Sequence, residues 1–97
     1  MRFIIKTQES ILRLGRILGY QLLGSRDNEF NFVRPLEWGG YPRFHLYIKE
    51  EKERFIFNLH LDQKRPSYDG SHAHSGEHEG PLLEAEAERI KKELGKN

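Results

Sequence analysis

Two stretches of alternating apolar and polar residues are the clearest structural signal in the chain. They are residues 43–49 (RFHLYIK) and 54–62 (RFIFNLHLD), and the charged segment EEKE lies between them. Successive side chains of a strand point to opposite faces, so this pattern predicts an antiparallel hairpin with one apolar face. The expected register pairs Lys49 with Arg54.

The second face of this predicted hairpin is polar. Its side chains are Arg43, His45, Tyr47, Lys49, Arg54, Ile56, Asn58, His60 and Asp62. A slip of one residue would bury these groups against the core, so the hydrophobic pattern defines which side chains share a face.

Helical spacing of apolar residues occurs near both ends of the chain. Residues 2–6 (RFIIK) are expected to form a short strand, and a helix follows with Thr7 as its N-cap and Gly19 at its end. Pro81 suits the first turn of a second helix, which Gly95 ends. The apolar positions are Ile11, Leu14 and Leu18 in the first helix and Leu83, Ala87, Ile90 and Leu94 in the second.

A further hairpin is expected over residues 20–34, with its turn at Arg26-Asp27-Asn28. The predicted class is therefore α+β, with an antiparallel sheet built from hairpins 20–34 and 43–62. An N-terminal and a C-terminal helix pack on one face of this sheet. The chain is long enough for one core, so residues 1–97 are expected to form a single domain. The polar face of the sheet stays free.

Composition limits the chemistry and the location of the protein. The sequence has no cysteine, which excludes disulfides and cysteine-ligated zinc, and this favours a reducing, cytoplasmic setting. No segment approaches the ~20 apolar residues of a membrane span, so no membrane contact is expected. Residues 1–49 carry eight Lys or Arg against four acids, whereas residues 50–97 carry eight against eleven. The basic half can meet phosphates, or it is an ordinary solvated surface.

A long loop rich in glycine and histidine is expected over residues 63–81. It contains His72, His74 and His78, and imidazoles bind zinc, nickel and similar ions well. We expect residues 67–80 to be ordered by such an interaction, because the three glycines of this segment are otherwise costly to fix. The alternative is a disordered loop in which the histidines are incidental.

The polar strand face offers a second group of metal ligands. His45 and His60 are expected opposite each other or one diagonal apart, and Asp62 lies two residues beyond His60 on the same face. The prediction is a divalent transition metal, zinc or nickel, bound by His45, His60, Asp62, His72, His74 and His78. The alternative is a solvated face without a ligand.

Basic and hydroxyl groups near this face suit phosphate or a nucleic-acid backbone. They are Arg43, Arg54, Lys64, Arg65 and Tyr68. Trp38 and Tyr41 precede the hairpin and either stack on bases or cover the core. No nucleotide-cofactor motif such as GxGxxG is present, so no nucleotide cofactor is expected.

Three segments carry a resemblance to other proteins. FHLYIK, FNLHLDQKRPSY and AHSGEHEGPLLEAEAERIKK resemble segments of a group of small bacterial single-domain proteins, and this resemblance spans nearly the whole chain. It implies no activity. The order of elements is also similar to double-stranded-RNA-binding folds and to RNA-targeting toxins of the HicA type. This second likeness is topological, and it transfers no catalytic residue.

Two main functions follow as hypotheses. The first is a small metal-binding domain, with metal-dependent hydrolysis of a phosphodiester as its enzymatic form. The second is a non-catalytic module that binds nucleic acid or a phosphorylated ligand through the same face. A protein-interaction domain that uses the histidine-rich loop is a third reading.

Overall fold

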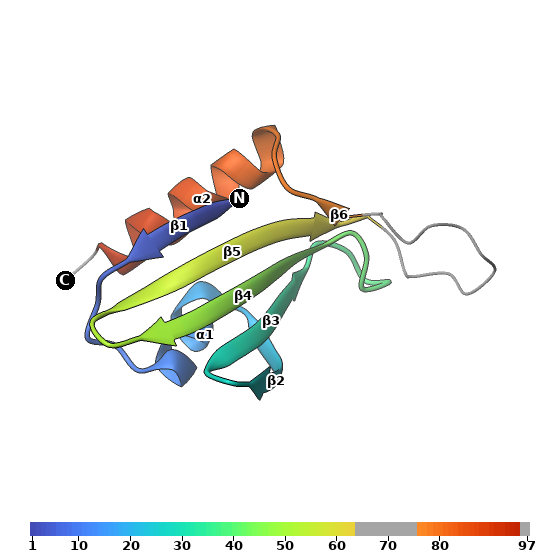
Figure 1. Cartoon of the computed structure of the whole chain (residues 1–97). Helices are drawn as coiled ribbons and strands as arrows, with labels where there is room; N and C mark the ends of the chain where they lie inside the picture. Colours follow the sequence, from blue (N-terminus) through green and yellow to red (C-terminus); the bar gives the residue numbers. More distant parts are fainter. Residues whose placement is uncertain (64–75, 96–97) are drawn as a thin grey trace.

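The computed structural model describes residues 1–63 and 76–95 of the chain. Its elements make an α+β structure, as predicted, in which an antiparallel sheet carries two helices (Figure 1). The strands are β1 (Arg2–Ile5), β2 (Gln21–Arg26), β3 (Glu29–Pro35), β4 (Arg43–Glu51), β5 (Arg54–Asp62) and β6 (Gly76–Glu77), and the helices are α1 (Ile11–Leu18) and α2 (Pro81–Leu94).

The N-terminal strand β1 and the hairpin strand β2 form the two ends of the strand order, and β5, β4 and β3 lie between them. Neighbouring strands follow the order β1-β5-β4-β3-β2, and β6 pairs with the end of β5. The predicted N-terminal strand is confirmed, and it lies antiparallel to β5 with Phe3 opposite Phe57. Because β6 pairs with Leu61 and Asp62, the chain returns beside the last residues of β5 before it enters α2.

The β4–β5 hairpin has the predicted faces but a different register. Glu51 pairs with Arg54, and a two-residue turn joins them, so the predicted pairing of Lys49 with Arg54 is wrong by two residues. A hydrogen bond of 2.9 Å from Arg54 Nε to Glu51 Oε1 closes the end of the hairpin. A shift by two residues keeps every side chain on its face, which is why the apolar pattern tolerates it.

The β2–β3 hairpin turns through Asp27 and Asn28 alone, since Arg26 belongs to β2. Both turn residues have positive φ (52° and 65°), the backbone that a tight two-residue hairpin turn requires and that Asp and Asn tolerate. The register shifts between Leu22 and Gly24, so Leu23 forms a bulge in β2. Such a bulge twists the edge strand and redirects its side chains.

One buried cluster contains residues of the sheet and of both helices. Alternate residues of β4 and β5, among them Leu46, Ile48 and Phe57, are almost completely buried. The same buried cluster includes Leu14, Leu18, Leu83, Ala87 and Ile90 from the helices. In α1, Gly15 lies so close to the ring of Phe32 that a Cβ atom would collide with it.

The helix ends agree with the predictions except at one position. Ser10, not Thr7, caps α1 by accepting a hydrogen bond from the Arg13 N–H at 3.3 Å, while the Thr7 hydroxyl accepts one from Glu9. Gly19 ends α1 with a φ of 80°, where glycine is strongly preferred. The second helix begins at Pro81 and ends before Gly95, as predicted.

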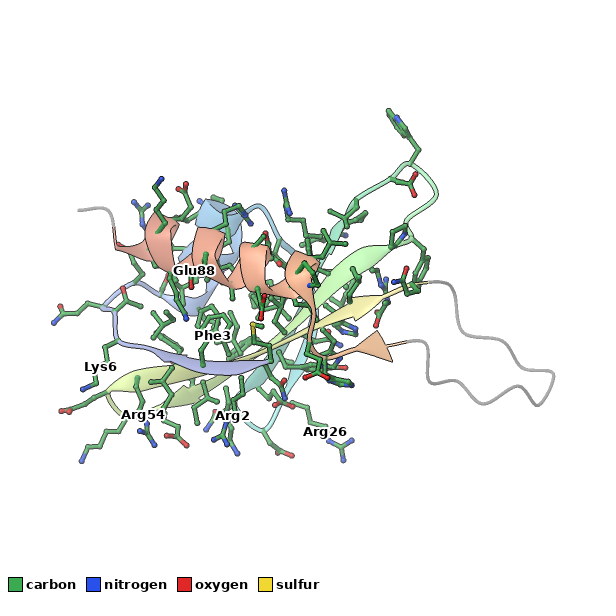
Figure 2. All side chains as sticks on the ribbon, turned by 90° about the horizontal axis from the view of Figure 1, so that it is seen from above. Arg2, Phe3, Lys6, Arg26, Arg54 and Glu88 are labelled. Atoms are coloured by element: carbon green, nitrogen blue, oxygen red, sulfur yellow. The ribbon has the colours of Figure 1, made fainter. Side chains whose placement is uncertain are left out.

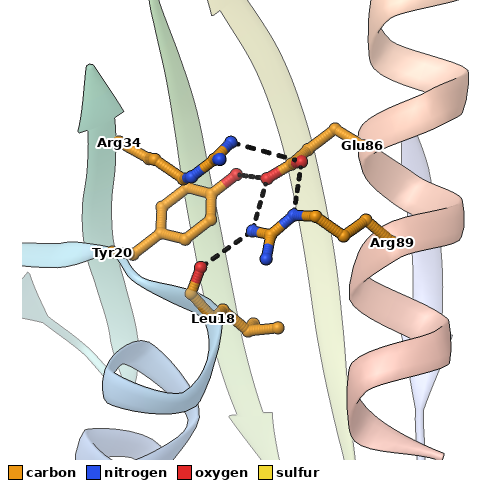
Figure 3. A network of polar contacts seen from close by, with 5 residues as sticks. All are labelled: Leu18, Tyr20, Arg34, Glu86 and Arg89. Carbon is orange, nitrogen blue, oxygen red and sulfur yellow. Dashed lines mark hydrogen bonds and ion pairs between the residues drawn. The ribbon is translucent and has the colours of Figure 1, made fainter. Parts of the chain in front are cut away.

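A buried carboxylate holds α2 against the rest of the fold (Figure 3). Glu86 is 4% exposed, and it accepts hydrogen bonds from Tyr20 (2.6 Å) and from two nitrogens of Arg89 (2.8 and 2.9 Å). Arg34 contributes an ion pair at 3.4 Å. Arg89 also donates to the carbonyl oxygen of Leu18, at the end of α1. The sequence pattern did not single out Glu86.

Burial alone would raise the pKa of Glu86. The hydrogen bonds from Arg89 and Tyr20 and the two guanidinium charges outweigh it, so this pKa is lowered. Burial and the hydrogen bond to Glu86 raise the pKa of Tyr20. The network therefore holds an ionised carboxylate and a neutral phenol.

No helix in the described part of the chain is long and apolar enough to cross a membrane.

Candidate functional site

The candidate site lies on the sheet face that carries the alternate, polar residues of β4 and β5. His45 pairs directly with His60 across the two strands, and Arg43 pairs with Asp62. The predicted proximity of His45, His60 and Asp62 therefore holds, although the register differs by two residues. We refer to this side of the sheet as the open face.

His45 is held at both ring nitrogens. Its Nδ1 lies 3.0 Å from Asp62 Oδ2, and its Nε2 contacts the side-chain oxygen of Asn31 on β3. These two contacts fix the orientation of the ring between β3 and the end of β5. Arg43 Nε donates to the same Asp62 oxygen at 3.2 Å. Asp62 therefore orients both the imidazole of His45 and the guanidinium group of Arg43 on the open face.

Four rings contact one another on this face, and we call them the ring row: His45, Tyr47, His60 and His78. His45 stacks on Tyr47 with 4.6 Å between ring centroids, and His60 lies 5.6 Å from His45 and 5.2 Å from Tyr47. His78 extends the row beyond His60, at 4.7 Å. Two strands, β4 and β5, and the segment after β6 thus place polar and aromatic rings side by side.

The return of the chain through β6 places His78 in the row. The α-amino group of Met1 donates to the carbonyl oxygens of Leu59 and His78, each at 2.9 Å. Burial lowers the pKa of this amino group, and the nearby Glu79 opposes the shift. From residue 76 onward the chain therefore lies back along the end of β5.

His60 differs from His45 because its imidazole makes no hydrogen bond within the described residues. Burial lowers its pKa, and the charges of His78, His45 and the N-terminus act in the same direction, while Asp62 opposes them. Its ring is consequently neutral at neutral pH. The pKa of Tyr47 is raised by burial and by the carboxylates of Asp62 and Glu29, so its hydroxyl keeps its proton.

Four of the six predicted metal ligands lie within the described residues. His45, His60, Asp62 and His78 share one region, whereas His72 and His74 lie outside the described residues. Within residues 1–63 and 76–95, no three His, Asp or Glu side chains are arranged to hold a metal ion. Asp62 and His45 bond to each other, which leaves His60 and His78 as the described imidazoles that can accept a ligand.

Two of the five residues predicted to contact phosphate lie within the described residues. Arg43 and Arg54 are described, whereas Lys64, Arg65 and Tyr68 lie outside the described residues. The guanidinium of Arg43 lies 4.6 Å from the ring centroid of Tyr41, and only its Nε hydrogen-bonds within the described chain. Figure 2 shows Arg2, Arg26 and Arg54 on the side of the sheet away from α2.

The loop before β4 contains Trp38 and Tyr41, which the sequence suggested would either stack on bases or cover the core. Trp38 is fully exposed, so the interpretation of its ring as a cover for the core is wrong. Tyr41 is half-buried beneath Arg43.

Two features of the open face escaped the sequence-based prediction. One is Asn31, the side chain that contacts His45 from β3. The other is a pocket of about 340 Å³ beside Tyr47, between β2, β3 and β4. The alternation in EFNFVR was the available signal for Asn31, because its apolar neighbours Phe30 and Phe32 lie on the opposite face.

No family model, curated protein or solved structure matches this chain.

Proposed function

We propose that the open face binds single-stranded nucleic acid. The observation that carries the proposal is the ring row beside the guanidinium group of Arg43. Proteins that bind single strands combine rings on which bases stack with cations that follow the phosphates. An antiparallel sheet that presents such rings on one face is a common platform for single-stranded RNA.

The charges of the open face support an anionic ligand. By strand alternation, β1 to β5 present five cations there, Arg2, Arg26, Arg43, Lys49 and Arg54, against three acids, Glu29, Glu51 and Asp62. The cations on this face therefore exceed the acids by two. The proposal takes both helices to cover the opposite face, which their shared buried cluster supports. A nucleic-acid ligand also suits the cytoplasmic setting expected from the sequence.

Single strands fit better than a duplex because the rings need unstacked bases. The side chains of Tyr47 and His60 lie at the centre of the sheet, where only a splayed base can reach them. Phosphates on either side of such a base meet Arg43 or the arginines along the edges of the sheet.

Fluorescence anisotropy with a labelled eight-nucleotide RNA of mixed sequence tests the proposal. Binding should weaken steeply as salt rises and should not respond to EDTA. Replacement Tyr47→Leu removes a stacking ring and should weaken binding about tenfold. Leu12→Ala, at an exposed position of α1, is the matched control and should bind like the wild type. Absence of salt-dependent binding in the wild type would exclude the proposal.

A metal ion is the second candidate, and one observation favours it. His60 and His78 are adjacent, and neither imidazole donates or accepts a hydrogen bond within the described chain. Such a pair can supply two nitrogen ligands to zinc or nickel, and an ion there beside Arg43 would suit phosphodiester hydrolysis.

Elemental analysis of protein purified without a histidine tag tests this second candidate. The expected result is a near-stoichiometric transition metal that is lost in both His60→Asn and His78→Asn. A metal content below about a tenth of an equivalent, with no thermal shift on adding zinc or nickel, would exclude it.

A further inference from the structure

A hollow in the open face lies directly beside the ring row. Its volume of about 340 Å³ is at the lower end of the range for small-ligand pockets, roughly 300–1,000 Å³. Its lining includes Leu23, Gly24, Arg26, Glu29, Asn31 and Tyr47. Tyr47 is shared between this pocket and the ring row, so one ligand chain can reach both.

The bulge in β2 and a glycine create the hollow. Gly24 pairs with Asn31, and a Cβ atom added to Gly24 would meet nothing within 4 Å. Any larger residue would place its side chain in this space. The bulged Leu23 is half exposed and supplies an apolar wall. The pocket thus has one apolar wall, an open floor and an aromatic ring.

The polar side chains Glu29 and Asn31 of β3 lie along one edge of the pocket. Glu29 pairs with Arg26 across the hairpin, and Asn31 follows two residues later on the same face. The oxygen of Asn31 faces His45, so its amide hydrogens are the groups left for a ligand. A carboxylate accepts hydrogen bonds only, and Glu29 makes none within the described residues. A planar ligand in the pocket therefore meets an acceptor and a donor side by side.

We propose that this pocket receives one base of the bound strand and that Glu29 selects guanine. The inference rests on the proposed binding of single-stranded nucleic acid. Guanine presents two neighbouring donors, N1–H and the N2 amino group, to which one carboxylate can bind bidentately. Its O6 lies next to N1 and can accept from Asn31. Adenine and cytosine place a ring acceptor beside their amino group, which repels a carboxylate, and uracil has a single donor between two carbonyls.

The test compares four labelled RNA hexamers that differ at one position in an otherwise all-uridine strand: guanine, inosine, adenine or uracil. Inosine keeps N1–H and O6 but lacks the N2 amino group. The wild type should bind the guanine strand about tenfold more tightly than the other three. Replacement Glu29→Gln should reduce this preference to about twofold, because a neutral amide lacks the second acceptor that a carboxylate offers to guanine.

A second variant fills the pocket without touching a charged group. Gly24→Leu places a side chain in the hollow and should remove the guanine preference, with the salt dependence unchanged. Gly39→Leu is the matched control, because Gly39 also has nothing within 4 Å of an added Cβ and lies outside the pocket. Equal affinity of the wild type for all four strands would overturn this inference and leave the proposed function standing. Binding to none of them would reject the proposed function itself.

Discussion

At the scale of single residues, the open face contains two histidines with opposite surroundings. His45 is held between Asp62 and Asn31, whereas His60 is partly buried without a hydrogen bond in the described chain. The partly buried environment of His60 lowers its pKa and favours the neutral ring, because burial disfavours the charged form. The difference predicts a measurable dependence of stability on pH.

The unfolding free energy should fall as the pH drops below about 6.5, and His60 should contribute to this fall. Its pKa is lowered in the folded state, so the unfolded chain binds more protons in the range below 6.5. Urea denaturation in EDTA-containing buffer between pH 7.5 and 5, followed by circular dichroism, measures the effect. His60→Asn should show a shallower fall than the wild type. Asn58→Ala, at an exposed position of β5, is the control and should keep the wild-type dependence of stability on pH. If His60→Asn also keeps the wild-type dependence, His60 does not contribute to the fall in stability.

Glu86 provides the second prediction at this scale. Replacement by glutamine keeps the shape but leaves Arg89 and Arg34 without their carboxylate, so the unfolding free energy should fall by about 2 kcal/mol. Both arginines are about one-third exposed, which keeps the loss below that of a fully buried pair. Chemical denaturation measures it. Glu88→Gln, on the exposed side of α2, should change stability by less than about 0.5 kcal/mol, and equal effects of the two changes would refute the role of Glu86.

At the scale of elements, the contact between α1 and β3 depends on the missing side chain of Gly15. Alanine there has the better helix propensity by about 1 kcal/mol, yet its Cβ would collide with the ring of Phe32. Overpacking should dominate, and Gly15→Ala should destabilise the protein by about 1–2 kcal/mol. Thermal denaturation compares it with Gly39→Ala, whose Cβ enters open space. A stabilised Gly15→Ala variant would show that the helix moves away from β3 without cost.

The elements were predictable from sequence because each depends on a local pattern. Alternation from residue 43 to 62 predicted β4, β5 and their faces, and the Pro81 and Gly95 signals predicted both ends of α2. The register was not predictable from alternation, since a shift of two residues preserves the faces. It follows from the two-residue turn at 52–53 and from the Arg54–Glu51 pair that closes it.

The site was predictable only where its members come from one hairpin. His45, His60 and Asp62 share a face by alternation, so their proximity follows from the strands themselves. Asn31 and Gly24 reach the site through the order of strands in the sheet, which no local pattern encodes. Glu86 likewise meets Tyr20, a partner 66 residues earlier in the chain, so its burial could not be read from the helix pattern alone.

At the scale of the whole molecule, the two sides of the sheet differ in the side chains that they present. One side carries the buried strand residues of the core, and the other presents rings, cations and a pocket. Electrostatic binding of a single strand should therefore depend on where a cation lies and not on the total charge, which is only +1. The arginines at the edges of the open face allow this to be measured directly.

A triple variant that neutralises Arg2, Arg26 and Arg54 by serine should lose much of its salt-dependent binding. Each phosphate contact contributes a slope of about −0.7 in a plot of log K against log salt for single strands, so the slope should become less steep by about two. The control removes three cations from the helices, Arg13→Ser, Arg16→Ser and Lys92→Ser, and it has the same net charge. Anisotropy titrations at several salt concentrations should give the control the wild-type slope. If both variants change the slope equally, the protein binds through its overall charge, and the open face is not the binding surface.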